Sequence, residues 1–403
     1  LSPPAELEPE SPPITEFLPS VRVGWGVSLD ATLARLVDLA SDQTPLDPRL
    51  RALALDVVRG VPAESTDERA RRLYHYVLEH IQEGKETDGR HVLMGKSGSR
   101  QAAFRYLLRL VGIRSELALV KNRLATPPLG KMSEIEAYDA LVMRLTTNLG
   151  ARWLTIRDKF APFGYVASEL REQAAIVLID GMPREEVHAP GAVDQVVYEG
   201  RADVREDGSA KLDLVLTFAG NRAIAWRSAL DQIPQAKLYD FVERELVAPS
   251  FDGGHVREMK ADAVAALDQP LVMHLRIDVP ELAKATHGGL ALHPPFAPHL
   301  AQLASLPERR TPILHRATWR AEVRMHVVLP ERLRMPSQLP HAELRNSGAL
   351  VVVRDAVTGH AIDFDRVIDF PAGRIQPGAE YAAWQKFTQQ ADAVVTRDVL
   401  IGK

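Results

Sequence analysis

The sequence predicts an α+β protein in which a domain of helices followed by strands precedes a mostly-β domain. Apolar residues recur at helical spacing through residues 28–112 and alternate with polar residues through 114–156. Beyond residue 190, alternating segments dominate the chain. The length of 403 residues suits two or three domains.

The composition is that of an ordinary globular protein, with 46% apolar and 25% charged residues. The net charge is −4 and no run of like charges occurs, so neither nucleic acid nor an anionic membrane is expected as a partner. No apolar stretch reaches the ~20 residues of a membrane-spanning helix. The chain has no cysteine, which excludes disulfides, thiolate catalysis and cysteine-based metal sites. That absence fits an oxidising compartment, although cytosolic proteins can also lack cysteine.

The helices are expected after an extended, proline-rich leader at 1–24. The first helix, 28–40, has Ser28 available as its cap. The second, 50–60, is closed by Gly60. The third, 65–81, begins with a Ser65–Glu68 capping-box pattern, and its predicted buried stripe consists of Ala70, Leu73, Val77 and Ile81.

A fourth helix is expected from near Ser97 or Ser99 to Gly112. Its inward residues are predicted to be Ala103, Leu107, Leu110 and Val111. The period then changes, and short alternating segments at 114–121, 136–145 and 152–156 predict antiparallel strands. These elements define a first domain at 25–185.

The second domain, 190–403, is predicted to be a β-sandwich with an inserted helix at 235–247. Asp207-Gly208 marks a hairpin turn between its first two strands. A long loop is expected at 287–312 and a late helix at 380–395. Trp319, Trp384 and Phe387 are expected to pack in the core. Further strands are expected in the segments HVREMKADAV, PLVMHLRIDV, TWRAEVRMHVVLP, GALVVVRDA and AIDFDRVIDF.

The stretch GKSGSR at 95–100 lies where a helix begins and raises the question of a phosphate or nucleophile site. A phosphate loop would require a glycine at position 90, but Arg90 stands there and Gly89 is one residue off. A helix rather than a strand also precedes the stretch. Nucleotide binding is therefore not expected, and no cofactor is predicted.

A second interpretation comes from a resemblance to a known family. The run LLRLVGI at 107–113 is similar to the LLRALGI that follows a Gly-Asp-Cys in bacterial transglutaminase-like proteins of the papain fold. The same spacing aligns Gly95-Lys96-Ser97 with that tripeptide. FAPFGYVASEL at 160–170 and FLPSVRVGW at 17–25 resemble family flanks. The resemblance, densest over 64–180, implies a papain-like transglutaminase core of the envelope-associated kind, followed by a β-rich domain.

The resemblance also implies that the catalytic triad is lost. Ser97 occupies the place of the family's cysteine, Asp139 in AYDALV that of its histidine, and Thr155 in WLTI that of its aspartate. A serine needs a base to become a nucleophile, and an aspartate with an ordinary pKa near ~4 is a weak one. Structural roles are expected instead: Ser97 as a helix cap, Asp139 paired with Lys96, Arg100 or another cation, and Thr155 as a strand residue.

The histidines offer two other hypotheses. His91 precedes Ser97 by six residues and is the candidate base, whereas His75 and His80 are five apart and cannot share a helix face. His287, His293 and His299 recur in a proline-rich loop, with His315 and His326 further on. Their intervals do not fit a zinc site, so no metal is predicted.

The sequence therefore predicts a catalytically inactive transglutaminase-like module that binds a protein partner or forms part of a cell-envelope or extracellular assembly. The periplasm or cell surface of a bacterium is the expected location. Two alternatives remain open: a serine-dependent amidase or esterase using Ser97, and a carbohydrate- or peptidoglycan-binding protein acting through the β domain.

Overall fold

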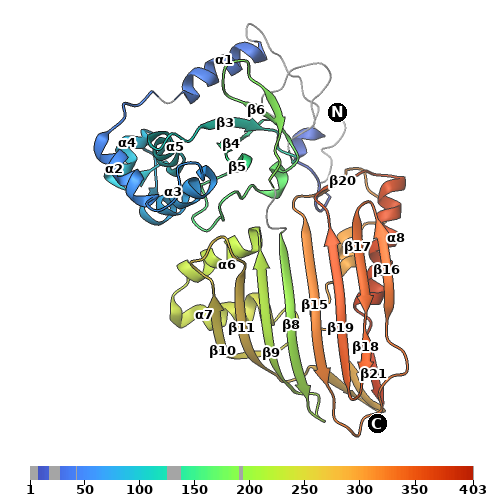
Figure 1. Ribbon diagram of the computed structural model, residues 1–403. Helices are drawn as coiled ribbons and strands as arrows, with labels where there is room; N and C mark the ends of the chain where they lie inside the picture. The colour runs from blue at the N-terminus through green and yellow to red at the C-terminus, as the bar shows by residue number, and fades with distance from the viewer. Residues whose placement is uncertain (1–7, 18–27, 42, 125–137, 190–193, 403) are drawn as a thin grey trace. The chain divides into compact units, whose positions relative to one another are not determined.

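The computed structural model describes residues 8–17, 28–41, 43–124, 138–189 and 194–402. The chain divides into two compact units, Pro12–Ala192 and Val193–Lys403, with Leu7–Ser11 belonging to the second. Helices and many strands are both present, so the α+β class is confirmed (Figure 1). Of the predicted leader at 1–24, only 8–17 lies within the described residues.

The first unit begins with helices that match most of the predicted ones. Ser28 caps the first of them, because its hydroxyl accepts the Ala31 N–H at 3.1 Å. All four residues of the predicted stripe at 70–81 are buried. The helix expected from near Ser97 or Ser99 to Gly112 is α5, whereas α4 before it was not predicted. The helices are α1 (Leu29–Ala40), α2 (Pro48–Val57), α3 (Thr66–His80), α4 (Gly89–Gly95) and α5 (Arg100–Leu110).

The predicted capping box on α3 is wrong. Ser65 is the N-cap residue, but its side chain accepts no capping hydrogen bond. Asn148 takes over this role from the turn between two strands: its Oδ1 accepts the Asp67 N–H at 2.9 Å and the Thr66 hydroxyl at 3.2 Å. A side chain 81 residues away thus satisfies the helix end.

A five-stranded antiparallel sheet follows these helices in the order β5-β4-β3-β6-β7. Alternation along β3 gives it two apolar faces: Ala118 and Val120 join a buried cluster with Trp153, while Leu117 packs on the side where Leu33 of α1 lies. The strands are β3 (Ser115–Val120), β4 (Ala140–Thr147), β5 (Gly150–Leu154), β6 (Ala174–Val177) and β7 (Arg184–Glu186).

The second unit is built on one nine-stranded sheet in the order β10-β11-β9-β8-β15-β19-β17-β16, with β18 paired to β19 (Figure 1). Every pair is antiparallel except β8 and β15. The predicted turn at Gly208 joins the first two strands, with φ +85°. The strands are β8 (Gln195–Val204), β9 (Ala210–Ala219), β10 (His255–Asp262), β11 (Leu271–Val279), β15 (Trp319–Val328), β16 (His341–Asn346), β17 (Ala349–Arg354), β18 (Ala356–Thr358) and β19 (Ala361–Phe370).

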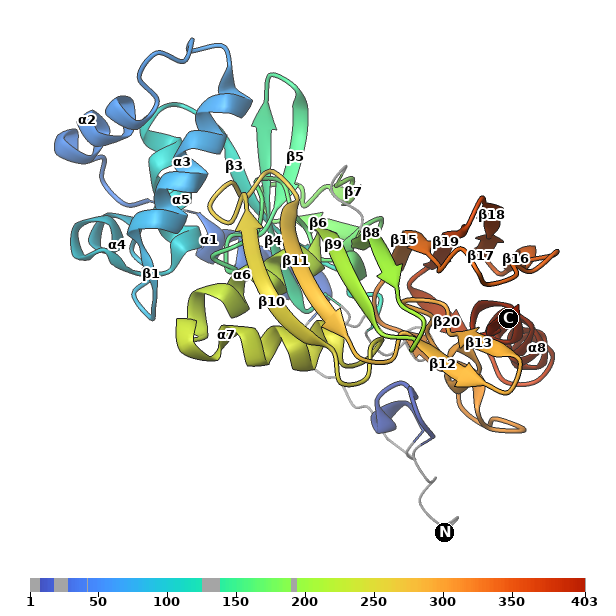
Figure 2. The ribbon, with the colours of Figure 1, turned by 90° about the horizontal axis from the view of Figure 1, so that it is seen from below.

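One face of this sheet is covered. Figure 2 shows helices and a small sheet gathered on the same side of the large sheet. Trp384 and Phe387 are buried in the cluster that α8 forms with β17 and β19, as predicted, whereas Trp319 is only partly buried. The covering elements are α6 (Asn221–Gln232), α7 (Gln235–Val242), α8 (Ala379–Val395), β12 (Ala283–Thr286), β13 (Gly289–Leu292) and β21 (Val399–Gly402).

The opposite face is polar, so the predicted β-sandwich is not what forms. Along β9, Leu212, Leu214 and Leu216 are buried, whereas Lys211 and Asp213 between them are exposed. Because each strand has one apolar face, a single covering layer of helices and short strands buries all of it.

Two other elements of the second unit differ from expectation. The helix predicted at 235–247 ends at Val242 and continues as one π-helical turn, Glu243–Val247, and α6 before it was not predicted. The long loop predicted at 287–312 contains β13 and the short helix Leu300–Ala304. The remaining short strands, β14 (Ile313–His315) and β20 (Gly373–Ile375), pair with each other.

The N-terminal segment 8–11 is held by the second unit. The Glu8 carboxylate accepts the N–H groups of Arg310 and Thr311 at 3.0 and 2.9 Å and also the Thr311 hydroxyl. Arg309 donates to the Pro9 carbonyl at 2.6 Å. Burial raises the pKa of Glu8, but these hydrogen bonds and the charge of Arg309 outweigh it, so the net pKa is lowered.

We expect Glu8→Gln to release this segment. A hydrogen bond to a charged acceptor stabilises by about 1.5–3 kcal/mol, so amide exchange at Arg310 and Thr311 should accelerate by about tenfold or more. Since the docked carboxyl has the lower pKa, its contribution is present above the ordinary glutamate pKa of about 4.3 and is lost as the pH falls below it. Hydrogen exchange compared with the wild type at equal pH measures both effects.

The exposed Glu331 provides the control. Glu331→Gln should leave exchange at Arg310 and Thr311 unchanged. Equal protection of these amides in Glu8→Gln and wild type would show that the carboxylate does not hold the segment.

Candidate functional site

The stretch GKSGSR links two helices rather than opening one. Lys96 adopts a left-handed conformation, φ +54°, and ends α4. Ser97 and Gly98 form the two-residue strand β2, which pairs in parallel with β1, Gln82–Glu83. Ser99 is then the N-cap of α5, because its hydroxyl accepts the Ala102 N–H at 3.2 Å.

Gly98 explains why the helix begins only after Ser97. Its φ of +138° is open to glycine, and a Cβ there would lie 2.5 Å from Val92 Cγ2 and 2.8 Å from the Glu86 carbonyl oxygen. The Ser99 N–H donates to that same carbonyl at 2.6 Å. The prediction that Ser97 caps the helix is therefore wrong by two residues.

Ser97 is exposed, and no imidazole in the described ranges is hydrogen-bonded to its hydroxyl. His91, the candidate base, is exposed on α4, where its backbone N–H donates to the N-cap carboxylate of Asp88 at 3.0 Å. His75 stacks edge-on against Tyr74, with ring centroids 5.6 Å apart. The His80 ring stacks on the Tyr76 ring, with ring centroids 4.3 Å apart.

Asp139 and Thr155 lie at the facing ends of β4 and β5. Asp139 is exposed just before β4, and its Oδ2 accepts from Asn122 Nδ2 at 3.4 Å. Met143 pairs with Leu154. Continuing that register sets Thr155 three positions from Asp139, or about 10 Å along the strand. The three residues aligned with the family triad are not hydrogen-bonded to one another in the part of the chain that the structure describes.

Thr155 follows the strand rather than belonging to it. Its N–H donates to the Tyr165 carbonyl at 3.0 Å, and its own carbonyl accepts the Tyr74 hydroxyl at 3.3 Å. Thr155 makes both hydrogen bonds with its backbone, so neither of them requires a threonine side chain at this position.

Arg100 is the residue near this stretch that sequence reasoning misjudged. It was a candidate partner for Asp139, but its guanidinium is buried and donates to the carbonyls of Ile81 and Arg157, each at 2.9 Å. The start of α5 is thereby tied to the chain leaving β5. An arginine followed by an apolar helix gives no sign in the sequence of which way its side chain turns.

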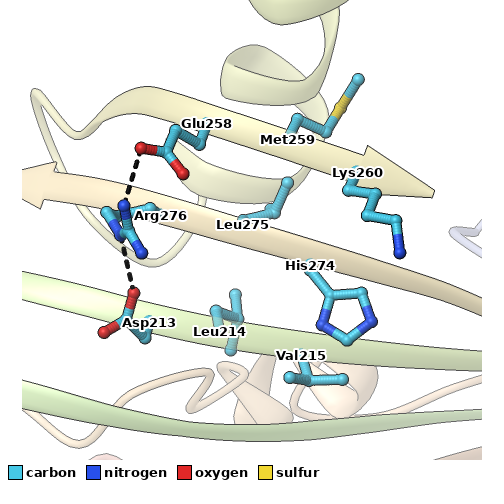
Figure 3. A pocket seen from close by; sticks show the side chains of 9 residues that line it. All are labelled: Asp213, Leu214, Val215, Glu258, Met259, Lys260, His274, Leu275 and Arg276. Carbon is cyan, nitrogen blue, oxygen red and sulfur yellow. Dashed lines mark hydrogen bonds and ion pairs between the residues drawn. The ribbon is translucent and has the colours of Figure 1, made fainter.

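The charged face of the large sheet carries a depression of about 380 Å³ (Figure 3). Arg276 donates to Asp213 at 3.1 Å and to Glu258 at 2.7 Å, and these contacts raise its pKa. Asp262, four residues after Glu258 on β10, has a lowered pKa, chiefly through its hydrogen bond with Lys260. These charges are already satisfied within the sheet, so the depression lacks an unpaired group that would select a charged ligand.

The loop histidines do not converge. His287, His293 and His299 are all exposed, and His293 pairs with Asp398 at 2.8 Å. His326 pairs with Asp363 at 2.6 Å, and burial lowers the pKa of His315. Among the described residues, no three His, Asp or Glu side chains are grouped as metal ligands.

The described helices include none that is both long and apolar enough to cross a bilayer. No protein-family model and no curated protein matches the sequence. The fold is similar to the crystal structure of a proposed protease from Parabacteroides distasonis, at 13% identity and a TM-score of 0.53. The match covers 93% of this chain and 58% of that one, so this chain spans just over half the length of its structural neighbour, and the likeness is one of fold.

Proposed function

We propose that the first unit is a catalytically inactive transglutaminase-like module and that the protein acts by binding a protein partner in a cell-envelope or extracellular assembly. The observation that carries the proposal is the local structure at Ser97. This residue is held in a parallel bridge with Gln82, while Ser99 takes the place at the helix start.

Two contacts support a transglutaminase-like fold that lacks the catalytic triad. Arg100 ties the start of α5 to the segment leaving β5, and these are the elements on which the resemblance places the family's triad. Asp139, in the histidine's position, instead accepts a hydrogen bond from Asn122. A carboxylate in that place does not activate a hydroxyl as imidazole does.

The absence of cysteine makes a thiol probe of this site straightforward. We expect Ser97→Cys to titrate with a thiol pKa of about 8.5, the ordinary value, because among the described residues no imidazole is hydrogen-bonded to this position and α5 begins only after Ser99. The rate of alkylation by iodoacetamide, measured against pH, reports that pKa on a single thiol.

Ser305→Cys, at an exposed position of the second unit, supplies the matched thiol. The two variants should have the same pKa. A Ser97→Cys pKa lowered to about 7 or below would reveal a nearby base or cation, and the serine-dependent amidase or esterase would then become the better proposal.

Labelling of the wild-type protein tests directly whether a base activates Ser97. A fluorophosphonate reacts with serines that a base has activated. We expect no adduct on Ser97 by peptide mass spectrometry. An adduct that disappears in Ser97→Ala would overturn the inactive module.

The likeness to a proposed protease is the reason to carry out both tests, since a shared fold does not carry a shared reaction. The binding half of the proposal predicts that the intact protein purifies from its bacterial envelope or medium with a partner in fixed ratio. A chain recovered alone from that fraction at native concentration contradicts it.

A further inference from the structure

The covered side of the large sheet contains a pocket that the proposed function does not use. A hollow of about 290 Å³ opens between strands β8, β9 and β15 and helices α6 and α7. Residues far apart in the chain meet there. Its principal lining side chains are Tyr198, Phe218, Arg222, Trp226, Phe241 and Trp319.

The walls are aromatic. Trp226 stacks with Phe218, with ring centroids 5.6 Å apart, and meets Phe241 edge-on at 5.5 Å. Trp319 is held edge-on against Phe370 at 5.4 Å. Rings fixed by ring contacts in this way give a preformed apolar surface, which favours flat, apolar ligands.

Hydrogen-bond donors outnumber acceptors around this hollow. The Tyr198 hydroxyl and the indole N–H groups of Trp226 and Trp319 make no hydrogen bond with any residue that the structure describes, and neither indole nitrogen is among the fully buried unsatisfied atoms. Arg222 likewise forms no ion pair or hydrogen bond within the described ranges, although its charge acts on Tyr198.

One carboxylate, that of Glu245, also lines the pocket. Glu245 is engaged by Arg244 at 2.8 Å. Arg222, which is exposed, is therefore the cation lining this aromatic hollow that has no protein partner among the described residues. Guanidinium groups bind carboxylates through paired, charge-assisted hydrogen bonds.

We propose that this pocket binds an organic carboxylate with a flat apolar body, such as an aryl or indolyl acid or the C-terminal residue of a peptide. The body lies among the rings of Trp226, Phe241 and Trp319, and the carboxylate meets Arg222. A group of indole size fits a hollow of about 290 Å³. This site is independent of the chemistry at Ser97, so it stands or falls apart from the proposed function.

Isothermal titration calorimetry on the full chain tests the proposal. Indole-3-propionate is expected to bind saturably with a Kd of about 1 mM or tighter. Its neutral amide and the cationic tryptamine are expected to bind about tenfold more weakly or worse, because they lose the charge-assisted pairing. No saturation by the acid up to about 10 mM, or equal binding of acid and amide, overturns the proposal.

Two peptides distinguish the sources of this ligand. A short peptide ending in tryptophan with a free carboxylate is compared with the same peptide amidated at its C-terminus. Binding of the free-acid peptide as tight as that of indole-3-propionate assigns the site to peptide ends. Binding of the small acid alone assigns it to free organic acids, and both results support the carboxylate chemistry.

Variants locate the binding. Arg222→Ala should weaken binding of the acid by about tenfold or more but leave the weak binding of the amide unchanged. Arg201→Ala, an exposed arginine on the opposite face of β8, is the control and should bind as the wild type does. Acid binding that survives in Arg222→Ala, or is lost equally in Arg201→Ala, contradicts the assigned pocket.

Discussion

Asp355→Ala is expected to lower the free energy of unfolding of the second unit by about 3–5 kcal/mol, because it leaves a buried guanidinium without its counter-charge. Arg366 is 2% exposed, and its Nε donates to Asp355 Oδ1 at 3.0 Å while a second nitrogen donates to Oδ2. The same guanidinium also donates to the Val395 carbonyl, so the pair joins β19 to the end of α8. Denaturant unfolding of the intact chain, followed by tryptophan fluorescence, measures the change.

The double variant Asp355→Ala/Arg366→Met should recover much of that loss. Burial raises the pKa of Asp355 even though Arg366 lies against it, so a desolvation cost accompanies the hydrogen bonds. Removing both charges removes that cost and leaves chiefly the Val395 carbonyl unpaired.

The exposed pair Arg201–Asp203 provides the control for these variants. Asp203→Ala should change stability by less than about 1 kcal/mol. A loss in Asp355→Ala no larger than that of the control, or a double variant less stable than the single one, contradicts the account of the buried pair.

The elements predicted correctly are those in which the spacing of apolar residues along the segment matches the face that is buried. β9 alternates strictly because one of its faces is covered, and α3 repeats its apolar stripe because it packs along its length. Helix α4 has seven residues with glycine at both ends, and α6 buries only Ala223, Ile224 and Arg227, so neither carries a clear stripe. In the small sheet β13 pairs with β21, which lies more than a hundred residues later in the chain. The spacing of apolar residues within a segment cannot predict a pairing between segments so far apart.

The predicted sandwich failed for a related reason. Alternation in a strand shows that one face is buried but not what buries it. Here α7, α8 and the small sheet cover the apolar face, while charge pairs such as Arg276–Glu258 occupy the other. The charged residues on that face were visible in the sequence, but their pairing depends on the order of the strands.

The sequence predicted the start of the helix after residues 95–100 only to within two residues. The sequence singled out residues 95–100, yet it offered two serines two positions apart as the start of the helix. The conformation of Gly98 and the bridge to Gln82 decide in favour of Ser99. Asp139 was expected to pair with a cation and accepts from Asn122 instead. The aromatic pocket was not predicted, since its walls come from separate strands and helices.

Arg227→Met is expected to lower the free energy of unfolding of the second unit by about 3 kcal/mol, since several buried acceptors lose one shared donor. Arg227 is 1% exposed on α6 and donates to the carbonyls that close the β10–β11 connection: those of Ala263 at 3.1 Å, Ala266 at 3.1 Å, Leu267 at 3.4 Å and Gln269 at 2.7 Å. Ala263 has a left-handed backbone, φ +59°, so the connection is strained where the arginine holds it. Burial lowers the pKa of Arg227 from its ordinary value, yet no other side chain type presents five donors in one plane.

Hydrogen exchange separates this role from simple packing. A methionine fills the space of the aliphatic stem, so the sheet should keep its protection while the amides of 263–269 exchange faster than in the wild type. Arg227→Lys should lie between the two, because three ammonium donors cannot reach four carbonyls. Arg244→Met, at an exposed arginine that pairs with Glu245 and lies over the Phe241 ring, is the control and should shift stability by less than about 1 kcal/mol. If Arg227→Met lowered the free energy of unfolding no more than Arg244→Met does, the prediction would be contradicted. The β10–β11 connection would then keep its conformation without the hydrogen bonds from Arg227.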